Sequence, residues 1–240
     1  MLKKMVVALA GTAMVAVMLA SVPGAGAAPV QGAAPYDPVL DPANFVSVID
    51  NPYYPLPVGR VLTYKDDAGA IDTVTVTNQT KVIIGITTTV VTQKLVSRQG
   101  NTLEKTTDWF AQDKQGNVWY LGEATKAYLP GGQVDPSGSW QAGVNGGQPG
   151  MIMEANPQIP DAYRQEYLKG EAEDTAWITG RGGSLTVPYG TVHHVVTTLE
   201  HSVLEPDVVE LKSYAPGLGE VFSHDIAGAT GLAQLVKVTG

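Results

Sequence analysis

The stretch Glu104-Lys-Thr-Thr-Asp-Trp-Phe-Ala-Gln-Asp-Lys-Gln-Gly-Asn-Val-Trp-Tyr-Leu-Gly122 decides the fold class. Two segments with Thr, Val and aromatic residues flank a polar turn from Asp113 to Asn117, in which Gly116 can adopt the positive φ of a tight turn. This pattern predicts an antiparallel β-hairpin. We expect four aromatic side chains to lie close together across the pair, in the core or against a ligand: Trp109, Phe110, Trp119 and Tyr120.

Segments of the same kind, separated by Gly, Pro, Asn and Asp, follow one another from Phe45 onward. Besides the hairpin, they predict strands at Val61–Lys65, Ile71–Thr77, Lys81–Ser97, Tyr163–Lys169, Thr175–Thr179, Ser184–Val187, Thr191–Leu204, Val208–Tyr214, Gly219–His224 and Ala233–Val238. The segment Lys81–Ser97 is long enough to need a bend, which we expect at Gly85. The region 131–150 is rich in Gly and predicts a long loop anchored by Trp140. The sequence therefore predicts an all-β, antiparallel, single domain over residues 45–240.

Asp161–Lys169 is open to two interpretations. Pro160 before it and Gly170 after it are typical of a short helix. However, Tyr163 and Tyr167 lie at strand spacing, and the neighbouring segments are strands, so we predict a strand.

The first 27 residues have the pattern of an export leader. Lys3 and Lys4 precede an apolar run from Met5 to Ala20, and small residues around Ala27 offer a cleavage site. The run is too short for a membrane span, so we expect a secreted or extracytoplasmic product. Residues 28–44 are small and rich in Pro, which predicts a flexible mature N-terminus.

Composition limits the classes of partner. Loss of Lys3 and Lys4 with the leader lowers Lys plus Arg from 15 to 13 against 23 acidic residues, a formal charge of −10. Such a surface repels nucleic acid and anionic membranes, so we expect neither as a partner. The chain has no cysteine, which excludes disulfides, thiol nucleophiles and thiolate metal sites. No motif predicts a cofactor, and we expect a monomer.

Three stretches resemble the framework of exported, mostly uncharacterised bacterial β proteins. They are Asn51-Pro-Tyr-Tyr-Pro-Leu-Pro-Val-Gly-Arg60 with Tyr64, Val187-Pro-Tyr-Gly190, and Lys212-Ser-Tyr-Ala-Pro-Gly-Leu-Gly-Glu-Val221. In outline this family is similar to the LolA-like and DUF3108-like half-barrels. The resemblance implies an antiparallel half-barrel or open barrel whose concave face holds a hydrophobic or amphipathic small molecule.

Six aromatic residues are candidates to line such a site, although core packing is the alternative for most of them: Trp109, Trp119, Tyr120, Trp140, Tyr163 and Tyr167. A second hypothesis is a secreted hydrolase or isomerase that uses carboxylates or a histidine, with or without a divalent cation. A third is a structural or adhesive surface protein.

Candidate metal ligands follow no known spacing. The acidic stretch from Glu166 to Asp174 could hold a hard cation, but it does not match an EF-hand, and solvated turn charges are the simpler interpretation. On one strand His193 and His201 would stand roughly 26 Å apart, too far to bind one metal ion. A histidine site would therefore need His224, or a carboxylate such as Glu200, Glu205 or Glu210, from a neighbouring strand.

Overall fold

The computed structural model describes residues 36–240. The expected leader, residues 1–27, lies outside the described residues, as does most of the segment 28–44. The described part contains 17 β-strands, one short 3-10 helix, η1 (Pro42–Asn44), and no α-helix. Every strand pair is antiparallel. The predicted all-β, antiparallel, single-domain fold is therefore confirmed.

Fifteen strands form one sheet. Its first half consists of β2 (Val61–Asp66), β3 (Ile71–Ile83), β4 (Ile86–Val96), β5 (Thr102–Asp113) and β6 (Val118–Tyr128). Its second half consists of β10 (Ala162–Arg164), β11 (Asp174–Arg181), β14 (Val196–Ser202), β15 (Val209–Ala215), β16 (Gly219–Ala227) and β17 (Leu232–Thr239). Short strands pair with β5 or β6, namely β1 (Phe45–Val46), β7 (Val134–Asp135), β8 (Trp140–Gln141) and β9 (Gly150–Met153). A separate hairpin is formed by β12 (Ser184–Val187) and β13 (Gly190–His193).

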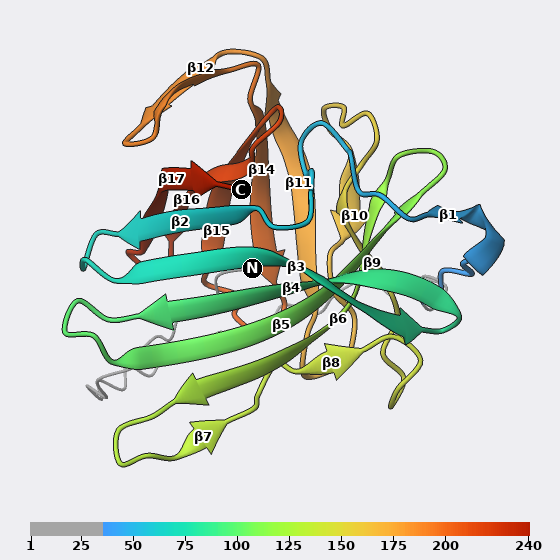
Figure 1. Cartoon of the computed structure of the whole chain (residues 1–240), viewed down its shortest axis with the longest axis horizontal. Helices are drawn as coiled ribbons and strands as arrows, with labels where there is room; N and C mark the ends of the chain where they lie inside the picture. The colour runs from blue at the N-terminus through green and yellow to red at the C-terminus, as the bar shows by residue number, and fades with distance from the viewer. Residues whose placement is uncertain (1–35) are drawn as a thin grey trace, which may run out of the picture. The chain divides into compact units, whose positions relative to one another are not determined.

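The two halves join where β17 pairs with β2, in the order β10-β11-β14-β15-β16-β17-β2-β3-β4-β5-β6-β7. In Figure 1 the strands β3 to β5 cross the direction of β11, β14 and β15, as in an open half-barrel. Alternation and register place one set of side chains on the same face, which we call the inner face: Tyr64, Val76, Asp108, Glu123, Lys212 and Ser223.

The prediction of one bent strand over Lys81–Ser97 is wrong. The chain reverses at Ile84 and Gly85, where β3 ends and β4 begins, and Ile83 pairs with Ile86. Both loop residues have positive φ, 44° and 82°. A two-residue turn of this kind matches the twist of the flanking strands, and sequence alternation continues through it unchanged.

A β-bulge at Leu121 and Gly122 redirects the inner face of β6. Asp108 pairs with Glu123, whereas Phe110 pairs with Tyr120, so β6 contains one residue more than β5 over this interval. Tyr120 and Glu123, three residues apart, therefore share a face. Gly122 has φ +148°, and a Cβ there would lie 2.6 Å from Trp140 O and 3.0 Å from Trp109 Cε3. Only glycine fits this position.

The segment Asn51–Arg60, which we call the strap, ties the two halves of the sheet together. At one end Gln112 Oε1 accepts the backbone N–H of Asn51 at 2.8 Å. Next to Asn51, the carbonyl of Pro52 accepts the N–H of Gly217 at 2.7 Å, and at the far end of the strap Arg60 donates to Gly217 O at 2.9 Å. The ring of Tyr54 lies 5.3 Å from Phe110 and 6.4 Å from Tyr214, measured between ring centroids. Tyr54 thus contacts both halves.

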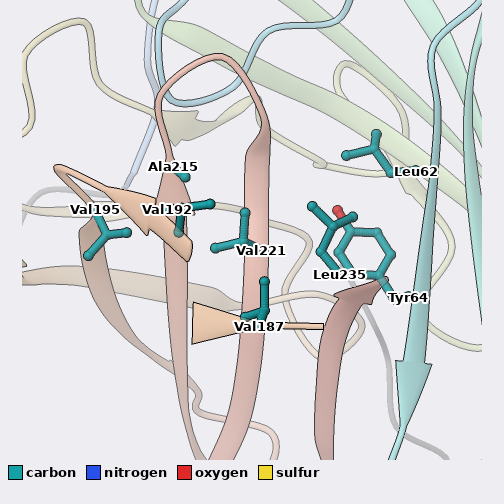
Figure 2. Packing of buried hydrophobic residues seen from close by; sticks show 8 residues of the cluster. All are labelled: Leu62, Tyr64, Val187, Val192, Val195, Ala215, Val221 and Leu235. Atoms are coloured by element: carbon teal, nitrogen blue, oxygen red, sulfur yellow. The ribbon is translucent and has the colours of Figure 1, made fainter. Parts of the chain in front are cut away.

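An apolar cluster packs where the β12–β13 hairpin meets β2, β16 and β17. Figure 2 shows its buried members, which are Leu62, Tyr64, Val187, Val192, Val195, Ala215, Val221 and Leu235. Pro188 ends β12, as expected for a residue without a backbone N–H. Tyr189 N–H donates to Leu235 O at 3.0 Å, which fixes the hairpin to β17.

Two further predicted strands are corrected. Thr191–Leu204 is divided into β13 and β14, because His194 adopts φ +57° and turns the chain. Within Tyr163–Lys169 the strand ends at Arg164, and the following residues make isolated bridges. The expected loop over 131–150 instead returns repeatedly to the edge of β6 through β7, β8 and β9.

The bulge predicts that Gly122→Ala destabilises the protein by about 3 kcal/mol or more, as backbone strain and overpacking add. The measurement is urea unfolding. Gly190→Ala is the matched control, because Gly190 has the same φ of +148° but no atom within 4 Å of a new Cβ. Equal losses in the two variants would contradict the packing argument.

Candidate ligand-binding site

Two carboxyl groups meet one phenol on the inner face of β5 and β6. The Tyr120 hydroxyl oxygen lies 2.7 Å from Asp108 Oδ1 and 2.8 Å from Glu123 Oε2. The Thr125 hydroxyl donates to the other oxygen of Glu123. Tyr120 is fully buried, and each of the two acids is 2% exposed. We call Asp108, Tyr120 and Glu123 the carboxyl triad.

The carboxyl triad must hold an extra proton. One hydroxyl can donate one hydrogen bond, so Tyr120 satisfies one carboxylate, and the other carboxyl group must donate its own proton to the phenol oxygen. Burial and the nearby Glu123 raise the pKa of Asp108 to about 7. We therefore place the proton on Asp108, with Tyr120 donating to Glu123.

Aromatic rings pack against Tyr120 of the carboxyl triad. Phe110 stacks on Tyr120 with centroids 4.6 Å apart, and Trp140 meets Tyr120 edge-on at 5.4 Å. Tyr54 of the strap covers Phe110 from the other direction. Tyr54 is half-buried, so it lies between this ring cluster and solvent.

A second polar cluster lies on the inner face of β14 and β15. Lys212 Nζ is 2.7 Å from Glu200 Oε2 and 3.4 Å from Glu210 Oε2. Tyr214 donates to the other Glu200 oxygen at 3.0 Å. Burial by itself would lower the pKa of Lys212, but Glu200 and Glu210 outweigh burial and raise that pKa well above its ordinary value. The ammonium stays charged and neutralises Glu200.

Several inner-face polar atoms are buried without a hydrogen-bond partner in the described part of the chain, namely Asp72 Oδ1, Thr106 Oγ1, Trp140 Nε1 and Ser223 Oγ. Gln93 satisfies the second Asp72 oxygen at 2.6 Å. Buried polar groups in native proteins are nearly always satisfied by protein, water or ligand. The inner face therefore leaves these four polar atoms available to water or to a ligand.

The six aromatic residues expected to line a site do not form one cluster. Tyr120 and Trp140 pack together at the carboxyl triad. Tyr163 aligns with Ala176 and Glu200, which places it on the inner face of the second half. The other three lie apart and make different contacts: Trp109 under Lys81 Nζ at 3.3 Å, Trp119 donating to Asp113, and Tyr167 under Arg164.

The histidines are dispersed. His193 is exposed and hydrogen-bonded to Ser184, whereas His224 packs beside Phe222. No described histidine hydrogen-bonds to Glu200, Glu205 or Glu210. In the described chain no group of three or more His, Asp or Glu could hold a metal ion. The described residues therefore show no histidine–carboxylate cluster that would support the hydrolase hypothesis.

The acidic stretch 166–174 is not a uniformly solvated turn. Glu166 is fully buried, whereas Glu171 is exposed. Glu173 accepts the backbone N–H of Gly170 at 2.8 Å. These acids therefore occupy different environments.

Sequence reasoning missed the carboxyl triad, because simple alternation puts Tyr120 and Glu123 on opposite faces. A signal was present in Gly122, since a glycine inside a strand pattern often marks a bulge. It also missed Tyr54 and the Lys212 cluster, whose members become neighbours only through strand pairing.

The protonated carboxyl group predicts that stability falls between pH 5 and pH 7. Unfolded Asp108 has an ordinary pKa near 3.8 and is ionised there, whereas folded Asp108 keeps its proton up to about pH 7. Unfolding releases that proton, so rising pH favours unfolding by up to about 1.4 kcal/mol per pH unit. Asp72, with a pKa of about 6 raised by burial, acts in the same direction.

Urea unfolding at several pH values tests this dependence. Asp108→Asn should reduce the slope, while Asp72, Glu154 and Glu220, whose pKa values burial also raises, keep part of it. This variant should be more stable than the native chain at pH 8. Glu205→Gln, at an exposed position, is the control that should leave the slope unchanged. A native slope that rises with pH would refute the shared proton.

The ion pair predicts that Lys212→Met costs about 3–5 kcal/mol, because it leaves Glu200 charged and buried. The double variant Lys212→Met/Glu200→Gln should recover most of this loss in urea unfolding. A single variant as stable as the native chain would show that Glu200 does not depend on Lys212.

Comparisons with known proteins give only partial likenesses. No family model matches the chain, and no curated protein matches it. A Bacteroides fragilis chain described as an exported protein with a YMCC-like fold matches with TM-score 0.46 and 15% identity, over 78% of this chain and 99% of that one. A Parabacteroides distasonis chain described as a lipoprotein matches with TM-score 0.41 and 13% identity, over 78% and 98%.

Neither likeness is close enough to transfer a function or a residue role. These matches do not show the expected similarity to LolA-like or DUF3108-like proteins. Within residues 36–240 we find no helix with the length and hydropathy needed to span a bilayer.

Proposed function

We propose that this chain is an exported binding protein that holds an amphipathic small molecule against the inner face of its half-barrel. Two features of different chemistry support the proposal. The apolar cluster around Leu235 occupies the region of β2, β16 and β17. The carboxyl triad and its aromatic rings occupy the region of β5 and β6. A ligand with an apolar part and a polar part matches this division.

The observation that carries the proposal is the set of unpartnered buried polar atoms on the inner face, such as Thr106 Oγ1 and Trp140 Nε1. A buried polar group without a partner costs about 1–3 kcal/mol, so a fold that needed only a core would place apolar side chains here. A ligand that supplies the missing hydrogen bonds gains that energy on binding.

The strap provides the entry route in this proposal. Tyr54 contacts the inner-face residues Phe110 and Tyr214. The strap that carries it is hydrogen-bonded at both ends, by Asn51 to Gln112, Gly116 and Glu154 and by Arg60 to Gly217. Movement of the strap would expose the rings of the carboxyl triad. Of the six aromatic candidates, we propose Tyr120, Trp140 and Tyr163 as ligand contacts. We assign Trp109, Trp119 and Tyr167 to packing.

The proposal includes the location of the protein and its oligomeric state. The leader pattern supports a secreted or extracytoplasmic location, and the acidic mature chain supports a partner that is neither nucleic acid nor membrane. We propose a monomer, because the ligand site lies within one chain.

A structural or adhesive role is the second candidate. The observation that favours it is that the chain's own atoms already cover the inner face, with Tyr120 and Tyr214 almost completely buried. The two functions differ in whether the inner face of the sheet binds a small molecule.

Native mass spectrometry of the purified mature chain separates the two functions. We expect a bound small molecule that is released on denaturation. We also expect Tyr54→Ala to accelerate exchange of that molecule severalfold, because the entry route is opened, whereas Tyr189→Ala, a half-exposed tyrosine on the β12–β13 turn, should not. A bare chain that takes up no apolar probe would favour the structural role.

A further inference from the structure

We propose that the polar part of the ligand is a cation, an ammonium group bound by Asp108 and Glu123. This inference rests on the proposed function and names the class of ligand. The binding site is the carboxyl triad, with Phe110 and Trp140 as aromatic walls.

Buried negative charge exceeds buried positive charge on the inner face. The inner face buries the carboxyl groups of Asp72, Asp108, Glu123 and Glu200, whereas Lys212 is the one fully buried cation in the described part. Lys212 is already engaged with Glu200 and Glu210. Asp108 and Glu123 have no cation within ion-pair distance among residues 36–240. A buried carboxyl pair without a cation is expensive, and a ligand ammonium removes that cost.

Two unpartnered polar side chains neighbour the carboxyl triad along the paired strands. Thr106 is 3% exposed and lies two residues before Asp108, so it projects from the same face of β5, opposite Thr125. Trp140 is also 3% exposed and pairs directly with Glu123. Thr106 Oγ1 and Trp140 Nε1 have no hydrogen-bond partner in the described part. An ammonium N–H can donate to Thr106, and a hydroxyl next to the amine can accept from Trp140.

Aromatic rings flank the carboxyl triad at Tyr120. The Tyr120 ring lies 4.6 Å from Phe110 and 5.4 Å from Trp140, measured between centroids. Faces of aromatic rings attract cations, and the attraction grows when water is excluded. The same chain uses this interaction elsewhere, where Lys81 Nζ lies 3.3 Å above the Trp109 ring.

In the ligand-free protein, the proton on Asp108 supplies the positive charge that the ligand ammonium supplies in the complex. Without ligand, the proton on Asp108 allows both carboxyl groups to contact Tyr120. When an ammonium binds, Asp108 releases this proton to solvent and accepts an N–H from the ligand, while Tyr120 continues to donate to Glu123. Binding is thus an exchange of one positive charge for another.

Three probes of equal chain length test the headgroup: octylammonium, 1-octanol and octanoate. We expect isothermal titration calorimetry at pH 8 to show octylammonium binding about tenfold or more tighter than the other two, as charge-assisted hydrogen bonds require. Its affinity should fall between pH 8 and pH 6, by up to about tenfold per pH unit, because protons then compete. At pH 6, where Asp108 holds its proton, proton release on binding should appear as a dependence of the heat on buffer ionisation enthalpy.

Asp108→Asn should abolish both the preference for octylammonium and the proton release. Glu205→Gln, which removes one exposed acid, should keep both and so excludes binding to surface charge. Circular dichroism of each variant checks the fold.

The outcomes distinguish the two proposals. Equal or tighter binding of octanol or octanoate would overturn the cation inference and leave the binding function standing. Failure of all three probes, with no copurifying molecule, would overturn both.

Discussion

The hydroxyl of Tyr120 lies between two carboxyl groups, and its single proton can satisfy only one of them. This constraint requires a second proton, or another cation, at a site where all three residues are buried. It depends on the bulge at Gly122, which turns Glu123 onto the face of Tyr120. The bulge depends in turn on the missing side chain of Gly122, because the backbone of β8 approaches closely there.

The second half of the sheet also needs a positive charge beside a buried carboxylate, and it obtains that charge from a lysine. There Lys212 supplies the positive charge from a neighbouring strand, so Glu200 remains ionised and its pKa is lowered: burial opposes the shift, and Lys212 outweighs it. The two halves thus show two solutions for a buried carboxylate, a shared proton and a resident ammonium. Tyr54 of the strap contacts aromatic rings from both halves and so connects the two carboxyl environments.

The errors of sequence interpretation have a common physical origin. Period-two alternation reports which residues share a face only while the strand stays regular. At Ile84 and Gly85 the alternation continues through a two-residue turn without a break. Alternation alone therefore predicts one long strand where the structure has the end of β3 and the whole of β4. At Gly122 the opposite occurs, because one continuous strand changes face. A single sequence contains both glycines but not the partner strands that decide between a turn and a bulge.

The sequence by itself determined the all-β antiparallel class, the Asp113–Asn117 turn and the end of β12 at Pro188, because these depend on local φ preferences and local residue spacing. It also determined that no thiol chemistry operates here, since the chain has no cysteine. Only the tertiary structure decided that Asp108 and Glu123 share Tyr120, that Lys212 meets Glu200, and that Tyr54 closes over Phe110. These contacts join residues 12 to 56 positions apart or depend on a bulge, and register between strands is set by the burial energy of the whole sheet.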